Sequence, residues 1–196
     1  MISFLQYLTE ASKRKATFTF GRFQPPTIGH DKLFQQVLKY GRGGDVFVFG
    51  SSTHDSKRNP LTPKEKEFWL KKVAPRPIQV VVDPQIKTAL HVADFLSKQG
   101  YKELVMVIGQ DRVKDFERLL TSYNGVEQSN GLFFDFDSIE VKSAGKRDPK
   151  ATGVVGMSAS KLRQFAQDGD FENFKRGVSD QLSDQDKQKL LDDIQN

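Results

Sequence analysis

The sequence lacks several features on which whole classes of protein depend. None of its 196 residues is cysteine, which excludes disulfides, thiolate metal sites and cysteine nucleophiles. No apolar run approaches the roughly 18 residues of a membrane-spanning helix, so we expect no contact with a membrane. No internal repeat or low-complexity segment is present. Histidine is scarce, and the spacing of the few present is not that of a zinc site: His30, His54 and His91.

The charge is unevenly spread along the chain. The formal net charge is +5, from 30 Lys and Arg against 25 Asp and Glu. Residues 168–196 hold eight acidic and four basic residues, so this end carries −4 and the remainder carries +9. A basic body suits nucleotide phosphates and could also hold nucleic acid weakly. Solvated surface lysines explain the same excess, and both interpretations stay open.

Strand and helix patterns alternate along the chain. Strands are expected at 17–20, 46–49, 78–82 and 104–108, with short candidates at 133–136 and 139–141. Helices are expected at 31–40, 64–73, 88–98, 112–120, 158–167, 171–176 and 184–194. This order predicts a doubly wound, Rossmann-like α/β fold with a mostly parallel five-stranded sheet. The main domain would span residues 16–169, and a short helical C-terminal tail would span 170–196.

A Gly- and Pro-rich turn follows the first expected strand, at Gly21-Arg22-Phe23-Gln24-Pro25-Pro26-Thr27-Ile28-Gly29-His30. Gly21 has no Cβ, so the backbone can approach a ligand there. The following helix N-terminus offers free N–H groups and a positive dipole to an anion. His30 adds a donor that can carry charge near neutral pH. In doubly wound sheets such turns lie at the ligand-binding edge, so the segment predicts a phosphate site.

The end of this turn, Thr27-Ile28-Gly29-His30, resembles the HxGH or TxGH signature of the nucleotidylyltransferase superfamily. The preceding Gly-Arg-Phe-Gln-Pro is similar to the archaeal type of nicotinamide mononucleotide adenylyltransferase. Those enzymes usually have His where this chain has Thr27, whereas Thr occurs in the phosphopantetheine adenylyltransferases. The departure bears on the substrate and leaves the implied chemistry intact.

A second segment, Met157-Ser158-Ala159-Ser160-Lys161-Leu162-Arg163, is similar to the I-S-S-T-x-I-R motif of the same superfamily. Ser158 is a good helix N-cap, and alone the segment would be an ordinary capped helix. Its pairing with the first motif, in the right order and a domain's length away, favours the resemblance. In the superfamily, the two motifs close on opposite sides of one triphosphate.

Two weaker resemblances support the first two. Ile108-Gly109-Gln110-Asp111 is similar to the superfamily's I-G-x-D turn, which approaches the base and ribose, although alone it is only a turn. Asn59-Pro60-Leu61-Thr62-Pro63-Lys64-Glu65-Lys66 resembles the N-P-F-T-x-x-E-R stretch of nicotinamide mononucleotide adenylyltransferases. Lys66 stands where Arg is usual, which keeps the charge and loses the bidentate geometry.

The resemblance implies transfer of a nucleoside monophosphate, AMP from ATP before other nucleotides, to a phosphate-bearing acceptor such as nicotinamide mononucleotide, with release of pyrophosphate. His30 and Thr27 would act at the α-phosphate, and Lys161 and Arg163 would hold the β- and γ-phosphates. Mg²⁺ would arrive on the triphosphate, with Asp111 a nucleoside contact and no residue a metal ligand. The expected nucleotide-binding residues are Gly21, Arg22, Phe23, Gly29, Gly109, Asp111, Ser158 and Ser160.

Other functions stay open at this point. Cytidylyl transfer to a small phosphate ester is an alternative, because the base cannot be read from these motifs. A non-catalytic internal virion protein that binds nucleotide or DNA is another, although a scaffold would need neither His30 nor Arg163. A class I aminoacyl-tRNA synthetase fragment with a HIGH motif fails on length and on the lack of a KMSKS-type loop.

The N-terminal ten residues resemble the capsid-targeting propeptides of internal proteins in large tailed phages. Large tailed phages also encode cytidylyltransferase-like proteins to which this chain is similar. The resemblance rests on an apolar stripe that ends in Leu8-Thr9-Glu10, a form of the prohead-protease site. The resemblance implies that the partners are the prohead protease and the capsid interior. It also implies a location in the cytoplasm of an infected bacterium, and possible packaging in the virion. An N-terminal helix that packs on the domain explains residues 1–10 equally well.

Overall fold

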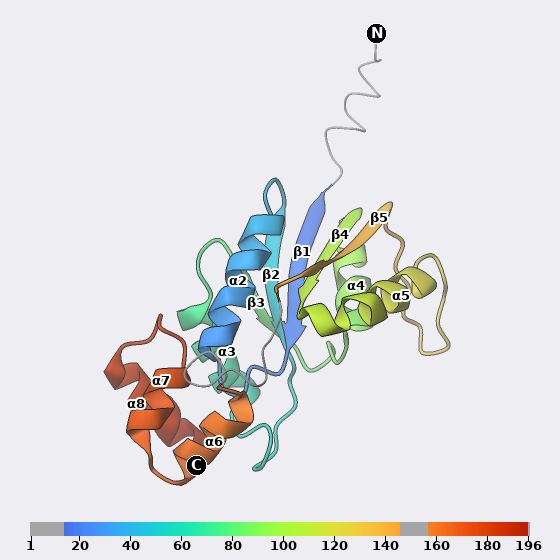
Figure 1. Cartoon of the computed structure of the whole chain (residues 1–196). Coiled ribbons are helices and arrows are strands. Elements are labelled where there is room, and N and C mark those ends of the chain that lie inside the picture. Colours follow the sequence, from blue (N-terminus) through green and yellow to red (C-terminus); the bar gives the residue numbers. More distant parts are fainter. Residues whose placement is uncertain (1–13, 146–156, 196) are drawn as a thin grey trace.

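The computed structural model describes residues 14–145 and 157–195 and contains a five-stranded parallel sheet with helices on both faces (Figure 1). The strands lie in the order β3-β2-β1-β4-β5, and each neighbouring pair is parallel. Their bounds are β1 Lys15–Gly21, β2 Asp45–Gly50, β3 Gln79–Val82, β4 Glu103–Ile108 and β5 Ser138–Ser143. The predicted doubly wound α/β fold is confirmed.

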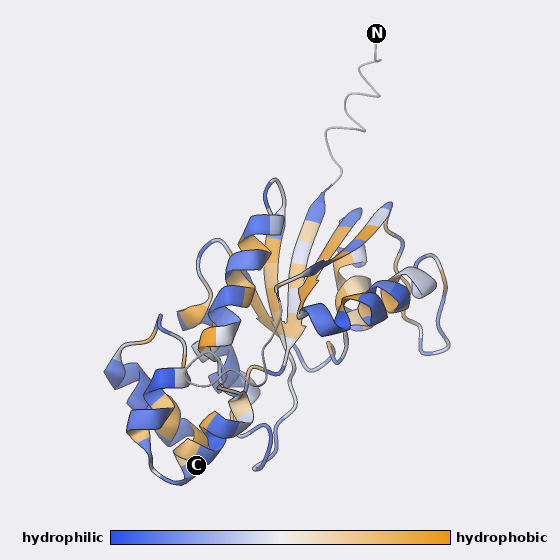
Figure 2. Cartoon of the chain, viewed as in Figure 1, coloured by the Kyte–Doolittle hydropathy of each residue, from blue (hydrophilic) through white to orange (hydrophobic). Residues whose placement is uncertain are grey.

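Two apolar layers cover the two faces of the sheet. Alternate strand residues such as Phe18 and Met106 pack with helix α4 (Ala89–Lys98) and helix α5 (Val113–Tyr123), which follows a 3₁₀ turn, η1 (Gln110–Arg112). On the opposite face, β2 packs with helices α2 (Ile28–Tyr40) and α3 (Pro63–Val73). Figure 2 shows this division, with apolar strands between helices whose outer faces are hydrophilic. Burial on both faces explains why the central strands read as continuous apolar runs.

Helix α2 begins three residues earlier than the pattern predicts. Thr27 has extended backbone and is the N-cap, so Gly29 and His30 lie in the first helical turn. The expectation of a helix from residue 31 was therefore wrong at its start. The apolar periodicity begins only at Leu33. The first turn faces the cavity described below and not the core, so apolar periodicity does not reveal it.

The expected strand at 133–136 is absent and its backbone is irregular. Its N–H groups bond to side chains instead, with Asp94 Oδ1 accepting from Phe133, Ser97 Oγ from Asp135 and Asn124 Oδ1 from Phe136. Alternating burial of Phe134 and Phe136 imitates a strand, although no neighbouring strand pairs with it.

The three expected C-terminal helices are present: α6 Ala159–Gln167, α7 Phe171–Gly177 and α8 Asp184–Gln195. They pack against α3 near the carboxyl ends of the strands (Figure 1). Trp69 Nε1 donates to Asp193 Oδ2 over 2.8 Å, and Leu162, Phe174 and Leu190 share one apolar cluster with Trp69. The tail is thus part of the same core as helix α3.

Residues 1–10, where the sequence suggests a targeting peptide, lie outside the described part of the chain. Within the described ranges, none of the helices has the length and apolar character that crossing a membrane requires.

Candidate nucleotide site

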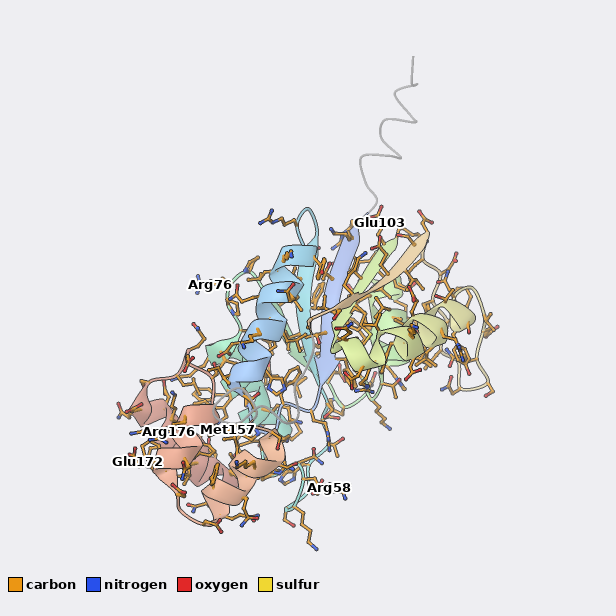
Figure 3. The ribbon with its side chains drawn as sticks, in the orientation of Figure 1. Arg58, Arg76, Glu103, Met157, Glu172 and Arg176 are labelled. Carbon is orange, nitrogen blue, oxygen red and sulfur yellow. The ribbon has the colours of Figure 1, made fainter. Side chains whose placement is uncertain are left out.

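A cavity of about 490 Å³ opens at the carboxyl ends of the strands. Its walls are the end of β1, the first turn of α2, the turn after β4 and the start of α6. Figure 3 shows two lining residues, Arg58 and Met157, toward this end of the molecule, while Glu103 at the start of β4 lies at the other end. The edge of a doubly wound sheet at which ligands bind is therefore also the edge with the hollow.

The turn after β1 is fixed by buried contacts. The side-chain amide of Gln24 donates to Leu61 O over 2.8 Å and accepts from Leu61 N over 2.9 Å. Phe23 adopts a positive φ of 48°, which is uncommon outside glycine, and its ring is buried. A Cβ on Gly21 would lie 2.9 Å from Phe23 Cζ, so this glycine makes room for the ring. The sequence suggested a close approach to ligand at Gly21, whereas the close approach in the structure is to Phe23.

His30 occupies a defined orientation in the first turn of α2. Its Nδ1 accepts the Thr27 backbone N–H over 2.9 Å, and its ring packs on Phe23 with centroids 4.8 Å apart. Because Nδ1 is an acceptor, the hydrogen of a neutral imidazole is on Nε2. Nε2 is then the ring nitrogen that can donate to a phosphate oxygen.

The second motif is connected directly to the first. Ser158 Oγ accepts from Lys161 N over 3.2 Å, which confirms the predicted N-cap of α6. Arg163 Nη1 donates to the Gln24 carbonyl over 2.6 Å, and its Nη2 donates to Ser160 Oγ over 3.1 Å. Gln24 and Arg163 lie 139 residues apart in sequence, so this hydrogen bond joins the two motifs at the cavity wall.

The turn after β4 contributes the third wall. Gly109 precedes η1, and a Cβ there would lie 2.8 Å from Asp111 Oδ1, so the turn needs a glycine to keep this carboxylate position. Asp111 is exposed and lines the cavity.

Eleven of the twelve residues that the sequence suggests for the site line this cavity. Lys161 does not line it, and its Nζ instead lies 5.7 Å from the centre of the Phe165 ring on the exposed side of α6. The roles assigned to these residues stay predictions. The eleven are Gly21, Arg22, Phe23, Thr27, Gly29, His30, Gly109, Asp111, Ser158, Ser160 and Arg163.

Three cationic residues of the cavity were missed by the sequence reasoning: Lys32, Arg58 and Arg112. Arg58 comes from a tight loop in which Asp55 accepts from the backbone N–H groups of Lys57 and Arg58. Its signal was available, because it directly precedes the Asn-Pro stretch that the sequence analysis singled out. Nothing in the pattern distinguishes Lys32 or Arg112 from solvated surface.

Lys66 lies beneath the loop that carries Arg58 and does not reach the cavity. It is buried, and its Nζ donates to the carbonyls of Ser51 and Thr53. Burial, followed by the charge of Arg22, lowers the pKa of Lys66 to about 8. Lys66 therefore holds the start of the loop after β2 through these two carbonyls.

The cavity carries an excess of positive charge. Five cationic side chains line it, against Asp111 as the single carboxylate among its lining residues in the described ranges. Burial, and next the charge of Arg22, lower the pKa of Arg163, while Asp55 raises it and Arg58 lowers it. A guanidinium stays charged under these conditions. Clustered arginines repel one another, so an anion bound among them would relieve the repulsion.

The cavity offers little to a metal ion on its own. Among residues 14–145 and 157–195, no three His, Cys, Asp or Glu side chains are grouped to hold one. A hard cation such as Mg²⁺ would take oxygens from a bound phosphate and from water, with Asp111 the carboxylate within the cavity.

Solved structures show the same fold. A putative nicotinate-nucleotide adenylyltransferase from Vibrio parahaemolyticus superposes with a TM-score of 0.56 at 13% identity, covering 93% of this chain and 99% of that one. Nicotinic acid mononucleotide adenylyltransferase from Plasmodium falciparum, complexed with NaAD, gives 0.52 at 14% identity, with 91% and 98% covered. At these identities the similarity concerns the fold.

Family membership rests on the sequence. No sequence among curated proteins matches the chain. The model of the cytidylyltransferase-like family matches residues 18–165, a span that includes both motifs and the turn after β4. The chain therefore belongs to the cytidylyltransferase-like family, within the nucleotidylyltransferase superfamily.

Proposed function

We propose that this nucleotidylyltransferase transfers AMP from ATP to the phosphate of a small acceptor such as nicotinamide mononucleotide. The observation that carries the proposal is the hydrogen bond from Arg163 to the Gln24 carbonyl, which joins the two motifs on one cationic cavity. An ordinary capped helix would not place its arginine on a turn 139 residues away, beside a helix N-terminus that favours anions.

The reaction needs positioning and charge stabilisation more than a protein nucleophile. An oxygen of the acceptor phosphate attacks the α-phosphorus in line, a new P–O–P linkage forms, and the α–β bridge breaks to release pyrophosphate. His30 Nε2 would donate to an α-phosphate oxygen, where charge develops in the transition state. Thr27 would donate nearby. Arg58 and Arg163 would hold the β- and γ-phosphates, and Mg²⁺ would enter as part of the triphosphate complex.

The choice of base and acceptor is guided by the neighbours. Of two structures of similar fold, one is described as a putative nicotinate-nucleotide adenylyltransferase and the other is a nicotinic acid mononucleotide adenylyltransferase complexed with NaAD. They support ATP and a pyridine mononucleotide as the first pair to test. Cytidylyl transfer to a small phosphate ester is the second pair.

A pyrophosphate-release screen tests the proposal. Four nucleoside triphosphates are each combined with a panel of phosphorylated acceptors, with His30→Ala as the impaired control. We expect release with ATP and a pyridine mononucleotide, and release slower by on the order of 10²–10³ with the control. Tight triphosphate binding without release for any pair would instead support a non-catalytic nucleotide-binding protein.

The packaging of the enzyme is a separate proposal that rests on the sequence of residues 1–10. Removal of a targeting peptide would leave a chain that begins at Ala11 and enters the virion, so that it could act before phage genes are expressed. Mass spectrometry of purified virions should show a peptide that starts at Ala11. An intact Met1 terminus, or absence from virions, would contradict it.

A further inference from the structure

The last residue of α7 and the first three residues that follow it, 177–180, lie against the first motif; this segment is called the link below. Val178 forms an antiparallel β-bridge with Thr27. Ser179 Oγ donates to Asp31 Oδ1 over 2.6 Å, and the backbone N–H of Asp180 donates to Asp31 Oδ2 over 3.0 Å. One carboxylate in the first turn of α2 thus accepts two hydrogen bonds from the C-terminal link.

The same link also lies against the second motif. A Cβ on Gly177 would lie 2.4 Å from Met157 Sδ and 2.7 Å from Leu162 Cδ2. Gly177 is therefore needed for a close approach to the helix that carries Arg163. Residues 177–180 contact both motifs.

Residues 177–179 of the link are buried, and no residue of the link lines the cavity. Val178 and Ser179 are fully buried, and neither they nor Asp31 line the cavity. The residues they hold do line it: Thr27 is bridged to Val178, and His30 directly precedes Asp31. The link can therefore influence substrate only through the first turn of α2.

We propose that Ser179 and Asp31 are positioning residues that fix the first turn of α2, and with it Thr27 and His30. The catalytic consequence rests on the function proposed above. A helix N-terminus has backbone groups without partners inside the helix, so its first turn frays unless other contacts hold it. A buried hydroxyl and a backbone N–H on a single carboxylate supply such contacts. The C-terminal tail is then part of the catalytic unit.

This role predicts a specific pattern of kinetic change. Arg163 bonds to Gln24 and Ser160 rather than to Asp31 or Ser179, so triphosphate affinity should fall much less than the rate. The rate of the chemical step should fall, since His30 would no longer be held at the α-phosphate. Misplacement of a reacting group by about 1 Å costs on the order of a hundredfold in rate.

Ser179→Ala is the test, with Ser183→Ala as the matched control. Ser183 is an exposed residue of the same tail whose Oγ accepts from Asp186 N, so its loss removes a serine hydroxyl and its hydrogen bond away from the motifs. We expect kcat to fall about ten- to a hundredfold in Ser179→Ala, with the dissociation constant for a non-hydrolysable ATP analogue changed by no more than about threefold. Ser183→Ala should leave both values unchanged.

A second readout works without turnover. The Thr27 N–H donates to His30 Nδ1, so its hydrogen exchange reports whether the turn is held. We expect faster exchange of this amide in ligand-free Ser179→Ala and not in Ser183→Ala. If Ser179→Ala does not fold, Asp31→Asn, which keeps one acceptor oxygen, should show the same changes at smaller size.

The outcomes separate this inference from the proposed function. A wild-type protein that transfers no nucleotide would contradict the function, while the exchange of Thr27 would still test the positioning. Active wild-type protein, with kcat and Thr27 exchange unchanged in the folded variants, would overturn the role of Ser179 and Asp31 alone.

Discussion

Arginines at the two ends of the sheet differ in whether a carboxylate pairs with their charge. At the amino ends of the strands, Arg14 donates to Asp45 over 3.3 Å and to Tyr101 Oη over 2.8 Å, and its guanidinium stacks on the Tyr101 ring at 4.2 Å. At the carboxyl ends, Arg22, Arg58 and Arg163 gather at one cavity. None of these three forms an ion pair in the part of the chain that the structure describes.

The difference separates an arginine whose charge is paired with a carboxylate from one whose charge is not. Arg14 has a carboxylate partner, an aromatic ring and the Gln99 carbonyl. Arg163 bonds to neutral oxygens, and among the described residues no carboxylate forms an ion pair with it. Removal of each should therefore affect different properties, stability at one end and ligand handling at the other.

The largest effect should come from His30→Ala at the carboxyl end. Loss of one donor to a developing negative charge typically costs on the order of 10²–10³ in rate. Pyrophosphate release measures the loss, and calorimetry should show nearly unchanged triphosphate affinity. Wild-type turnover by the variant would remove His30 from the chemistry.

Arg163→Ala compares the two ends directly. Loss of a charge-assisted hydrogen bond of about 1.5–3 kcal/mol should weaken binding of a non-hydrolysable triphosphate about ten- to a hundredfold, and binding of the acceptor much less. Arg14→Ala is the matched control at the other end of the sheet. It should leave affinity unchanged and cost at most about 1 kcal/mol of stability, because its ion pair is exposed. Equal affinity in both variants would mean that the second motif is only a capped helix.

Two glycines of the first motif should respond differently to alanine. In Gly21→Ala the new Cβ meets the buried Phe23 ring, and overpacking of this kind costs about 1–3 kcal/mol of unfolding free energy. In Gly29→Ala the Cβ meets only Thr27 Oγ1, at 3.4 Å. The stability of Gly29→Ala should be unchanged. Because Gly29 lines the cavity, its new methyl group should hinder a phosphate at the N-terminus of α2 and weaken triphosphate binding about tenfold or less, the size of one lost hydrogen bond. Denaturant unfolding and calorimetry read the two effects, and the reverse pattern would contradict the assignment.

The smallest effect concerns Tyr101 at the amino end. Burial, followed by its hydrogen bond to Asp45, raises the pKa of Tyr101 to about 12, against about 10 in an unfolded chain. The folded state holds this proton more tightly, so the contribution is complete below pH 10 and is lost as pH rises toward 12. Tyr101→Phe should lose less stability between pH 9 and 11 than the wild type in denaturant unfolding, with transferase activity unchanged. Parallel losses in the two proteins would contradict it.

The fold followed from the sequence where periodicity and topology agree. Strands β1 to β4 and the helices of the chain are set by apolar runs and caps, such as Pro63 after Thr62 and Ser158 before α6. Residues 133–136 could not be predicted correctly, because side chains of Asp94, Ser97 and Asn124 from distant positions take the place of a neighbouring strand.

The site was predictable where a motif marks it. The sequence brought together Gly21–His30 and Met157–Arg163, but it could not show that Lys161 lies on Phe165 outside the cavity, since side-chain direction depends on the packing of α6. The contribution of the C-terminal tail was also hidden. Ser179 and Asp31 are 148 residues apart, and neither lies in a pattern that links them.

The most direct test of a single triphosphate site shared by the two motifs is a crystal structure with Mg²⁺ and a non-hydrolysable ATP analogue. The α-phosphate should lie within hydrogen-bond distance of His30 Nε2, and the β- and γ-phosphates between Arg58 and Arg163. A triphosphate bound away from either motif, at full occupancy, would contradict the account.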